Sequence, residues 1–399
     1  MNKPSSGSPA KPELKPDTTL ATAGRNPFAH HGYVNPPVYR AATITYPTVE
    51  DYLAQRGPYA YGRVHTPTSE ALEQAIQALE GPACAGVALL PSGLAAIATA
   101  LLAVLKTGDR LLVSDSCYGP AREFCDTVLA RWGVTTTYYD PLIGAGIGAL
   151  MQPNTRAIYT EAPGSLTFEM QDIPAIAAAA HARGALVLMD NTWAGPLNFR
   201  ALDRGVDLSI QSGSKYVGGH CDLMLGTISA NVAAYARLRE TVLATGQCAG
   251  PDDMNLALRG LRTLGVRLAR HFQSGLQVAR WLAARPEVLR VLHPALPGDP
   301  GHAIWQRDFS GGCGLFGVVF EPAPEKAVHA FLDALTLFGI GASWGGYESL
   351  AIPYDATAVR TATRWSPGGP CIRLHVGLED TADLIGDLER GFAALAAAR

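Results

Sequence analysis

The chain has 399 residues, of which 48% are hydrophobic and 17% are charged, and its formal net charge at pH 7 is −3. This apolar content excludes a chain that is disordered over most of its length, and the small net charge gives no indication of binding to nucleic acid or to a membrane surface. The seven cysteines are scattered without a zinc-ligand spacing, which predicts free thiols and no metal site. Because no apolar run reaches about 18 residues and no secretory signal is recognisable, we expect a cytoplasmic protein.

We expect residues 1–64 to form a disordered tail and an extended arm rather than a domain. The N-terminal stretch "MNKPSSGSPAKPELKPDTT" is rich in Pro, Ser and Lys, a composition typical of disorder. The following segment "PPVYRAATITYP" is strand-like in composition but is interrupted by prolines. A helix is predicted to begin near Thr68, because apolar residues recur at helical spacing from there to a stop at Gly81.

Residues 65–258 alternate between short apolar segments and helical segments. The apolar segments are "GVALLPSG", "RLLVSD", "TRAIYTEAPG", "ALVLMDNTW" and "DLSIQSGSK". Apolar strands that alternate with helices predict a mostly parallel α/β sheet with helices on both faces. The sequence then predicts one long, basic, amphipathic helix over residues 258–288 and shorter strand candidates mixed with helices. Residues 259–399 are therefore predicted to form a second, smaller α+β domain.

Four of the turns that follow apolar segments carry residues suited to one chemistry. These residues are, in chain order, Ser92–Gly93 at the start of a helix, Tyr118, Asp190 at the end of a buried strand, and Lys215 among hydroxyl residues. We expect them to meet, because ligands bind at the carboxyl ends of parallel strands. A helix N-terminus suits a phosphate, an aromatic side chain can stack on a cofactor ring, a carboxylate can hold a pyridinium nitrogen, and a lysine can form a Schiff base. Together they predict a site for pyridoxal phosphate.

Each of these residues also has an ordinary structural interpretation. A lysine at a strand end is most often solvated, an aspartate there is most often a turn residue, and Ser-Gly before a helix is a common cap. The cofactor hypothesis depends on all four occurring in order at strand ends. The glycine-rich segment "GAGIGAL", residues 144–150, matches a dinucleotide-binding pattern only weakly, because a proline interrupts the preceding strand. It is predicted to be a loop.

The segments "DNTW" and "SIQSGSKYVGGHCD" resemble the Cys/Met-metabolism family of pyridoxal-phosphate enzymes, which have fold type I. The resemblance continues in order through "YGRVHTPT", "LLPSGLAAI", "EAPGSLTFEMQDIPAI", "SWGGYESL" and "IRLHVGLED", and it covers the chain from about residue 35 to the C-terminus. It implies a PLP-dependent transferase-like α/β fold. In this fold a mostly parallel seven-stranded sheet, residues 65–258, binds the cofactor, and a smaller α+β domain, residues 259–399, follows it.

The resemblance also implies roles for individual residues. Lys215 would form the Schiff base, Asp190 would bind the pyridinium nitrogen, and Tyr118 would stack on the ring and take part in catalysis. Tyr61 and Arg63 would reach the cofactor of a neighbouring subunit, where Arg63 suits the phosphate and Tyr61 would assist proton abstraction. The remaining cofactor-binding residues would be Ser92, Gly93, Leu94, Thr192, Ser212 and Ser214, and the substrate would contact Tyr118, Ser343, Trp344 and Arg373. Such shared sites imply a homo-oligomer, and the family suggests a tetramer.

The activity that the resemblance implies is β-elimination of L-cystathionine to homocysteine, pyruvate and ammonia, a step of transsulfuration and methionine biosynthesis. γ-Elimination or γ-replacement on related substrates and broad β-elimination of cysteine S-conjugates are alternatives. A non-catalytic regulator that binds pyridoxal phosphate is the alternative from another class. Two positions depart from the family's pattern. Ser214 stands where threonine is usual, and Leu243 stands where the β-eliminating branch has a tyrosine that bears on the distal part of the substrate.

Overall fold

The computed structural model describes residues 14–399. Most of the predicted tail, residues 1–13, lies outside the described residues. The tail prediction is wrong for the residues that follow, because helix α1 (Pro16–Thr22) begins inside the segment predicted to be disordered. A proline at the first helical position favours this start, and burial of Leu20 in the main hydrophobic cluster anchors the helix. The arm is not uniformly extended either, because it contains helix α2 (Val49–Leu53).

The larger domain is built on a seven-stranded sheet in the order β1-β7-β6-β5-β4-β2-β3. Its strands are β1 (Gly86–Leu90), β2 (Arg110–Ser114), β3 (Thr135–Tyr139), β4 (Thr155–Glu161), β5 (Leu186–Asp190), β6 (Leu208–Ser212) and β7 (Gly226–Ala230). Strands β6, β5, β4, β2 and β3 run parallel, whereas β7 is antiparallel to both of its neighbours. The prediction of a mostly parallel, seven-stranded sheet is confirmed.

Helices cover both faces of this sheet, and each face has its own hydrophobic cluster. The α-helices of this domain are α3 (Pro67–Glu80), α4 (Gly93–Val104), α5 (Gly119–Phe124), α6 (Ile173–His181), α7 (Gly195–Asn198), α8 (Tyr235–Ala244) and α9 (Pro251–Leu261). Shorter helical turns are η1 (Pro27–His30), η2 (Cys125–Leu129), η3 (Gly144–Leu150) and η4 (Leu202–Arg204). The glycine-rich segment is thus a 3-10 helix rather than the predicted loop, because its buried Ile147 packs beside α6.

The smaller domain contains a five-stranded sheet in the order β10-β11-β12-β9-β8. Its elements are α10 (Leu264–Ala283), β8 (Val288–Leu292), α11 (His302–Asp308), β9 (Leu315–Phe320), α12 (Glu325–Asp333), β10 (Gly339–Ile340), β11 (Leu350–Tyr354), β12 (Cys371–His375) and α13 (Thr381–Ala398). A third hydrophobic cluster joins this sheet to α10, α12 and α13. This arrangement is the predicted α+β domain.

The single long helix predicted at the start of the smaller domain is two helices. Helix α9 ends at Leu261 and α10 begins at Leu264, and Thr263 between them is not helical. Helix α9 packs against α3, whereas α10 packs against β8 and α13, so the break joins the two domains. Gly260 lets α9 approach the loop after β6, because a Cβ at Gly260 would lie 2.3 Å from the carbonyl oxygen of Val217.

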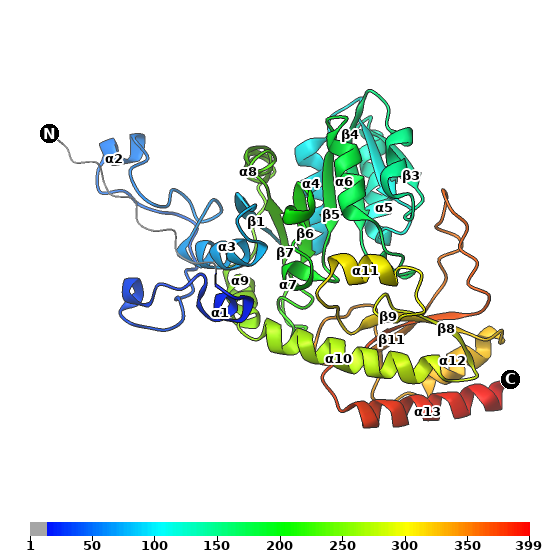
Figure 1. Ribbon diagram of the computed structural model, residues 1–399. Coiled ribbons are helices and arrows are strands. Elements are labelled where there is room, and N and C mark those ends of the chain that lie inside the picture. Colours follow the sequence, from blue (N-terminus) through cyan, green and yellow to red (C-terminus); the bar gives the residue numbers. More distant parts are fainter. Residues whose placement is uncertain (1–13) are drawn as a thin grey trace.

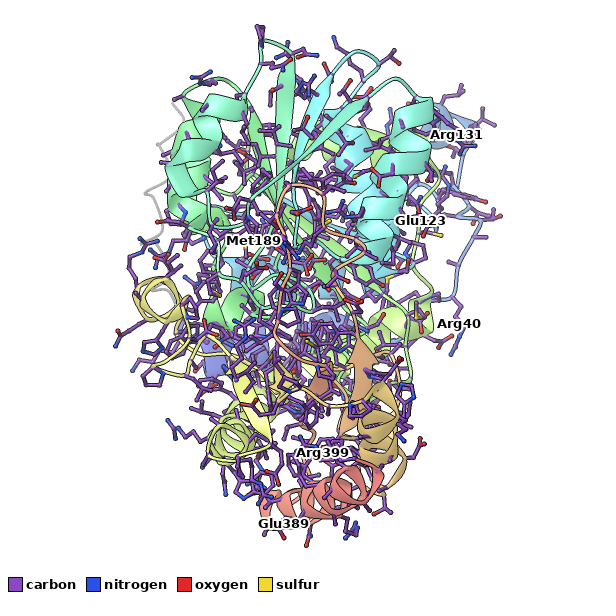
Figure 2. The ribbon with its side chains drawn as sticks, turned by 90° about the vertical axis from the view of Figure 1, so that its right-hand side faces the viewer. Arg40, Glu123, Arg131, Met189, Glu389 and Arg399 are labelled. Carbon is purple, nitrogen blue, oxygen red and sulfur yellow. The ribbon has the colours of Figure 1, made fainter. Side chains whose placement is uncertain are left out.

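Figure 1 shows the smaller domain below the larger one, with α10 and α13 running along the smaller one and the segment that carries α2 projecting from the body. In this projecting arm the segment "PPVYRAATITYP" forms no strand and contributes only an isolated bridge between Thr43 and Tyr61. Figure 2 shows Met189, near the end of β5, close to the middle of the molecule, whereas Glu389 and Arg399 lie in the smaller domain, toward the opposite end from the larger one. The carboxyl ends of the parallel strands therefore face the smaller domain.

Candidate active site

A cavity of about 590 Å³ lies between the two domains, at the carboxyl ends of β4, β5 and β6. Most of the residues predicted for the site line it, namely Ser92, Gly93, Leu94, Tyr118, Asp190, Thr192, Ser212, Ser214, Lys215, Ser343, Trp344 and Arg373. The structure thus brings together residues from several strand ends, as expected at the carboxyl edge of a parallel sheet. Tyr61 and Arg63 lie outside this cavity.

Lys215 lies in the turn directly after β6. Its Nζ donates a hydrogen bond to Ser343 Oγ at 2.6 Å and lies 5.4 Å from the centre of the Trp344 ring. Burial, together with the nearby Arg373 guanidinium, lowers the pKa of Lys215 to about 8. Roughly a tenth of this amine is therefore unprotonated at pH 7, a far larger fraction than for an ordinary lysine, and it can act as a nucleophile.

Asp190 ends β5 and lines the cavity. Two hydrogen bonds reach its Oδ1, from the backbone N–H and from the hydroxyl of Thr192. The Thr192 hydroxyl oxygen in turn accepts a hydrogen bond from the backbone N–H of Ser212 at 2.9 Å, so β5 and β6 fix this carboxylate together. Burial raises the pKa of Asp190 above its ordinary value. Within residues 14–399 no hydrogen bond reaches Oδ2, so a cationic ligand in the cavity would stabilise the charged carboxylate.

The first turn of α4 forms a cradle of small residues. Ser92 caps the helix by accepting a hydrogen bond from the backbone N–H of Ala95 at 3.1 Å. A Cβ at Gly93 would lie 2.7 Å from Ser212 Cβ, so only glycine lets the helix start this close to β6. The Ser214 hydroxyl lies nearby, where its oxygen accepts from the backbone N–H of Leu225 at 2.9 Å. Free N–H groups at a helix start and adjacent hydroxyls fit a phosphate group.

Tyr118 precedes α5 at the edge of the cavity. Its backbone N–H donates to Glu161 Oε2 at 2.8 Å. Burial, and then the charges of Asp190 and Glu161, raise the pKa of the Tyr118 phenol, so this side chain stays neutral at physiological pH. Glu161 was not predicted as a site residue, although it ends β4 beside Asp190 in the neighbouring strand. Its signal in the sequence is the same as that of Asp190, an acid at the end of a buried apolar strand.

The smaller domain contributes a cation and an aromatic wall. Arg373 on β12 donates hydrogen bonds from Nη2 to the carbonyl oxygens of Ala342 and Ser343, and burial lowers its pKa to about 10. Two residues later, His375 accepts a hydrogen bond at Nε2 from the backbone N–H of Gly345 at 3.2 Å. Strand β12 therefore holds the whole segment that carries Ser343 and Trp344. His375 was not predicted as a site residue, and only the alternation with Arg373 on one strand face could have indicated it.

The sequence and the fold can now be compared with known proteins. A model of the family described as "Cys/Met metabolism PLP-dependent enzyme" matches residues 17–393. The chain belongs to this family. It is 52% identical to a Rhizobium johnstonii protein that is provisionally named a cystathionine β-lyase, over 96% of each chain. It is 44% identical to the cystathionine β-lyase MetC of Escherichia coli K12, over 96% of this chain and 99% of the relative. A crystal structure of metB from Corynebacterium glutamicum superposes with a TM-score of 0.88 at 31% identity, covering 96% of this chain and 98% of that one.

In this Cys/Met-metabolism enzyme, the two predicted residues outside the cavity lie on the arm. Tyr61 is 45% exposed, and Arg63 donates a hydrogen bond from Nη1 to the carbonyl oxygen of Leu243 at 3.2 Å. Leu243 is the position that departs from the pattern of the β-eliminating branch, and it lies near the end of α8. The structure therefore groups Tyr61, Arg63 and Leu243 on one surface, apart from the cavity of the same chain.

Across the described part of this family member, no cluster of His, Cys, Asp and Glu side chains is arranged to hold a metal ion. Within residues 14–399, every helix is too short or too polar to span a bilayer.

Proposed function

We propose that this protein is a pyridoxal-phosphate-dependent carbon–sulfur lyase that cleaves L-cystathionine by β-elimination to homocysteine, pyruvate and ammonia. Relatives named as cystathionine β-lyases share 41–52% of their residues with it over nearly their whole length. The observation that carries the proposal is the convergence of Lys215, Asp190 and Arg373 on one cavity. An amine, a carboxylate and a cation for a substrate carboxylate are the three groups that this chemistry needs.

The residues around the cavity fit pyridoxal 5′-phosphate. Lys215 is the proposed covalent attachment point. Asp190, whose Oδ2 receives no hydrogen bond from the described part of the chain, is the proposed partner of the protonated ring nitrogen. When bound, the cofactor supplies an electron-withdrawing ring that stabilises negative charge at the substrate Cα. Tyr118 would stack on this ring. The proposed phosphate-binding groups are the side chains of Ser92, Thr192, Ser212 and Ser214 and the backbone N–H groups of Gly93 and Leu94.

Arg373 is the proposed binding group for the substrate α-carboxylate. Within residues 14–399 its guanidinium forms no ion pair and donates only to two backbone carbonyl oxygens. A half-buried cation without an anionic partner is costly, so this site favours a ligand that brings a carboxylate. Ser343 and Trp344, which lie beside Lys215 Nζ, would form the adjoining wall of the substrate site.

Lys215 is also the proposed base that removes the proton from the substrate Cα. Its pKa of about 8 lets a useful fraction of the amine accept a proton near neutral pH, and the short contact with Ser343 keeps Nζ in place. Homocysteine then leaves from Cβ as its thiol or thiolate. Tyr61 of a neighbouring subunit is the proposed second participant in this proton transfer, and Arg63 beside it would bind the cofactor phosphate of that subunit.

A homotetramer with active sites shared between subunits is the proposed assembly. The arm that carries Tyr61 and Arg63 exposes large apolar side chains, including Phe28 at 94%, Leu53 at 75% and Val49 at 74%. Apolar surface of this kind suits contact with a second copy of the chain. Mixing Arg63→Ala protein with Lys215→Ala protein under conditions that exchange subunits should restore part of the activity, and a mixture without activity would contradict the shared site.

We place the division between domains at the break between α9 and α10. Residues 1–64 are the tail and arm, the cofactor-binding domain begins at residue 65, and the smaller domain runs to residue 399. The sequence predicted the boundary at residue 258, but α9 crosses that position and packs against α3 of the cofactor-binding domain. The proposed location of the enzyme is the cytoplasm, and the proposed pathway is transsulfuration in methionine biosynthesis.

The keto acid released from substrate tests the proposed function. Purified, cofactor-supplemented protein should release pyruvate from L-cystathionine. Release of 2-oxobutyrate instead would assign the γ-elimination chemistry, and pyruvate from cystine or other cysteine conjugates without turnover of cystathionine would assign the broader β-lyase. A protein that shows the yellow absorption of a bound cofactor but releases no keto acid from any of these substrates would be a non-catalytic binder.

A further inference from the structure

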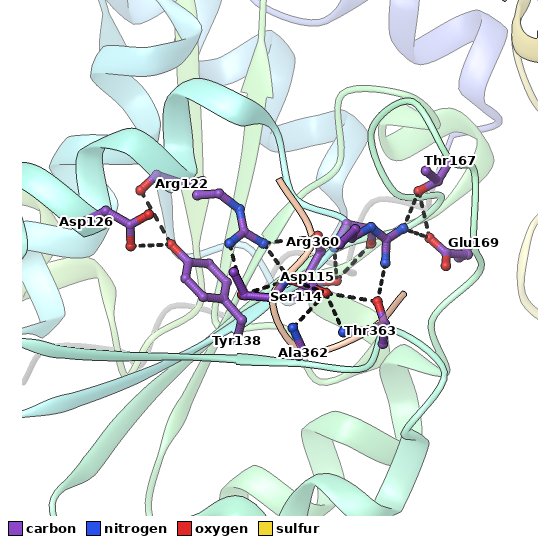
Figure 3. Close-up of polar contacts among 12 residues, drawn as sticks. Ser114, Asp115, Arg122, Asp126, Tyr138, Thr167, Glu169, Arg360, Ala362 and Thr363 are labelled. Carbon is purple, nitrogen blue, oxygen red and sulfur yellow. Dashed lines mark hydrogen bonds and ion pairs between the residues drawn. The ribbon is translucent and has the colours of Figure 1, made fainter. Parts of the chain in front are cut away.

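A dense group of polar contacts lies beside the cavity, where a loop of the smaller domain crosses onto the larger one (Figure 3). The loop consists of residues 355–370, which join β11 to β12, and we call it the clasp loop. It contacts the turn after β2, at Asp115, and the turn after β4, at Thr167 and Glu169. The first turn leads to Tyr118. The second turn lines the cavity with Pro163, Gly164, Ser165, Leu166 and Phe168.

Asp115 holds the clasp loop on the first turn. The residue is 2% exposed, and its carboxylate accepts hydrogen bonds from the backbone N–H groups of Thr361, Ala362 and Thr363 at 2.8 to 3.2 Å. Arg122 Nη2 donates to the same carboxylate at 2.6 Å. Burial would raise the pKa of Asp115, but these hydrogen bonds bring it below its ordinary value. A buried charge whose donors come largely from one loop is stable only while that loop is seated.

Arg360 holds the same loop on the second turn. Its side chain is 2% exposed, pairs with Glu169 and donates a hydrogen bond to Thr167 Oγ1 at 2.7 Å. Its other terminal nitrogen donates to Thr363 Oγ1 at 2.8 Å, and the Thr363 hydroxyl donates to Asp115 at 2.8 Å. One threonine of the loop therefore links the two anchors. The loop and both turns form a single connected network.

Two parts of the cavity lining lie next to this network, namely the turn after β4 and the turn that leads to Tyr118. Leu166 and Phe168 adopt positive φ angles of 63° and 56°, a conformation that non-glycine residues keep only when their surroundings hold it. The two turns are also joined directly, because the backbone N–H of Ser165 donates to the carbonyl oxygen of Ser116 at 2.8 Å. Tyr118 lies between Asp115 and Arg122, and its own carbonyl oxygen accepts from the Arg122 backbone N–H. The loop is thus bonded to Asp115 on one side of Tyr118, and Asp115 is bonded to Arg122 on the other side.

We propose that Asp115 and Arg360 are positioning residues that seat the clasp loop, and that the seated loop holds Tyr118 and the turn of residues 163–169 against the cofactor and substrate. This inference deepens the proposed function and rests on it for the identity of the substrate. The seating of the loop is a property of the chain that can be measured without turnover. The loop links the domains, so it couples their relative position to the geometry of the substrate site.

The kinetic test compares Asp115→Asn and Arg360→Met with Asp126→Asn in the cofactor-loaded enzyme. Asp126 is a matched control, because its carboxylate accepts a hydrogen bond from the Tyr138 hydroxyl at 2.6 Å in the same region and contacts no residue of the loop (Figure 3). Both clasp variants should lose about tenfold or more in kcat/KM for cystathionine, since small misplacements of binding groups are costly, while the absorption and content of bound cofactor stay unchanged. Arg360→Lys, which keeps the charge beside Glu169, should recover part of the loss.

Limited trypsin digestion measures how firmly the clasp loop is held on the larger domain, and it does not require catalytic turnover. Arg364 in the loop is exposed and present in all of these variants, so cleavage after it should be several-fold faster in Asp115→Asn and Arg360→Met than in the wild type or in Asp126→Asn, with or without cofactor. If Asp115→Asn does not fold, the same cleavage rates are compared in Arg360→Met and in the milder variant Thr363→Val. Wild-type kcat/KM in the clasp variants would overturn the proposal, as would a loss that follows cofactor content. If the wild-type enzyme does not act on cystathionine, the proposed function is wrong. The cleavage rates would still show whether Asp115 and Arg360 hold the clasp loop in place.

Discussion

The close approach of α4 to β6 predicts that one added methyl group at Gly93 weakens cofactor binding. A Cβ there would lie 2.7 Å from Ser212 Cβ and 2.8 Å from its Oγ, whereas ordinary contacts begin near 3.4 Å. Ser212 cannot retreat freely, because its backbone N–H bonds the Thr192 hydroxyl that orients Asp190. Helix α4 must shift instead, and its first N–H groups move away from the proposed position of the phosphate. Overpacking of this kind costs about 1–3 kcal/mol, which corresponds to a rise of roughly 5- to 150-fold in the dissociation constant of the cofactor.

Titration of the apoprotein with pyridoxal phosphate, followed by the absorption of the bound form, measures this effect in Gly93→Ala. Gly386→Ala is the matched control, because Gly386 lies inside α13 and no atom lies within 4 Å of an added Cβ. Alanine is favoured over glycine in a helix, so the control should bind cofactor like the wild type and unfold at the same or a higher temperature. Wild-type affinity in a correctly folded Gly93→Ala protein would refute the argument that α4 has no room to move.

Three further predictions concern the amine, its neighbouring cation and the core. Lys215→Ala should abolish pyruvate release and covalent attachment of the cofactor, and borohydride reduction of the wild type followed by peptide mapping should place the tag on Lys215; a tag at any other lysine would contradict the assignment. Arg373→Gln removes a cation that disfavours the Lys215 ammonium, so the pKa of Lys215 should rise above about 8, and the rate at which apoprotein captures cofactor should shift to higher pH; an unchanged pH profile would show that burial alone sets this pKa. Leu101→Ala deletes a fully buried side chain between α4 and the sheet, and should lower the free energy of unfolding by about 2–5 kcal/mol in denaturant titrations. A loss below about 1 kcal/mol would contradict this prediction, because it would show that the neighbouring side chains close the cavity.

The sequence could predict that four residues of the candidate site meet, because each of them lies in a recognisable local pattern. Ser92, Tyr118, Asp190 and Lys215 each follow a short apolar segment, and a parallel sheet brings the ends of such segments to one edge. Neither the strand order nor the antiparallel β7 had to be known for this argument. The smaller domain was predicted as a class of structure, and the resemblance to the family implied that Arg373 and Trp344 contact the substrate. The hydrogen bond from Arg373 to the Ser343 carbonyl oxygen was not predicted.

What the sequence could not predict depends on contacts between distant segments. Thr361 to Thr363 reach Asp115 across more than half of the chain, so no periodicity marks the clasp loop. The amphipathic pattern continues from α9 into α10, and the break at Thr263 is set by the two different surfaces on which the helices pack. Helix α1 is too short to be stable alone, and burial of Leu20 decides that it forms.

The two neighbouring acids at the ends of β4 and β5 differ in how strongly the protein stabilises their charged forms. Glu161 and Asp190 are neighbours in register, burial raises the pKa of both, and the Asp190 charge raises that of Glu161 further. The charged form of Asp190 is stabilised by two hydrogen bonds from Thr192 and by the Lys215 ammonium. The charged form of Glu161 is stabilised only by hydrogen bonds from the backbone N–H groups of Tyr118 and Ser165. Glu161 accepts the hydrogen bond from the Tyr118 backbone N–H, and both acids line the cavity. A cationic ring nitrogen at this edge of the sheet would therefore be stabilised most by the carboxylate of Asp190, its proposed partner.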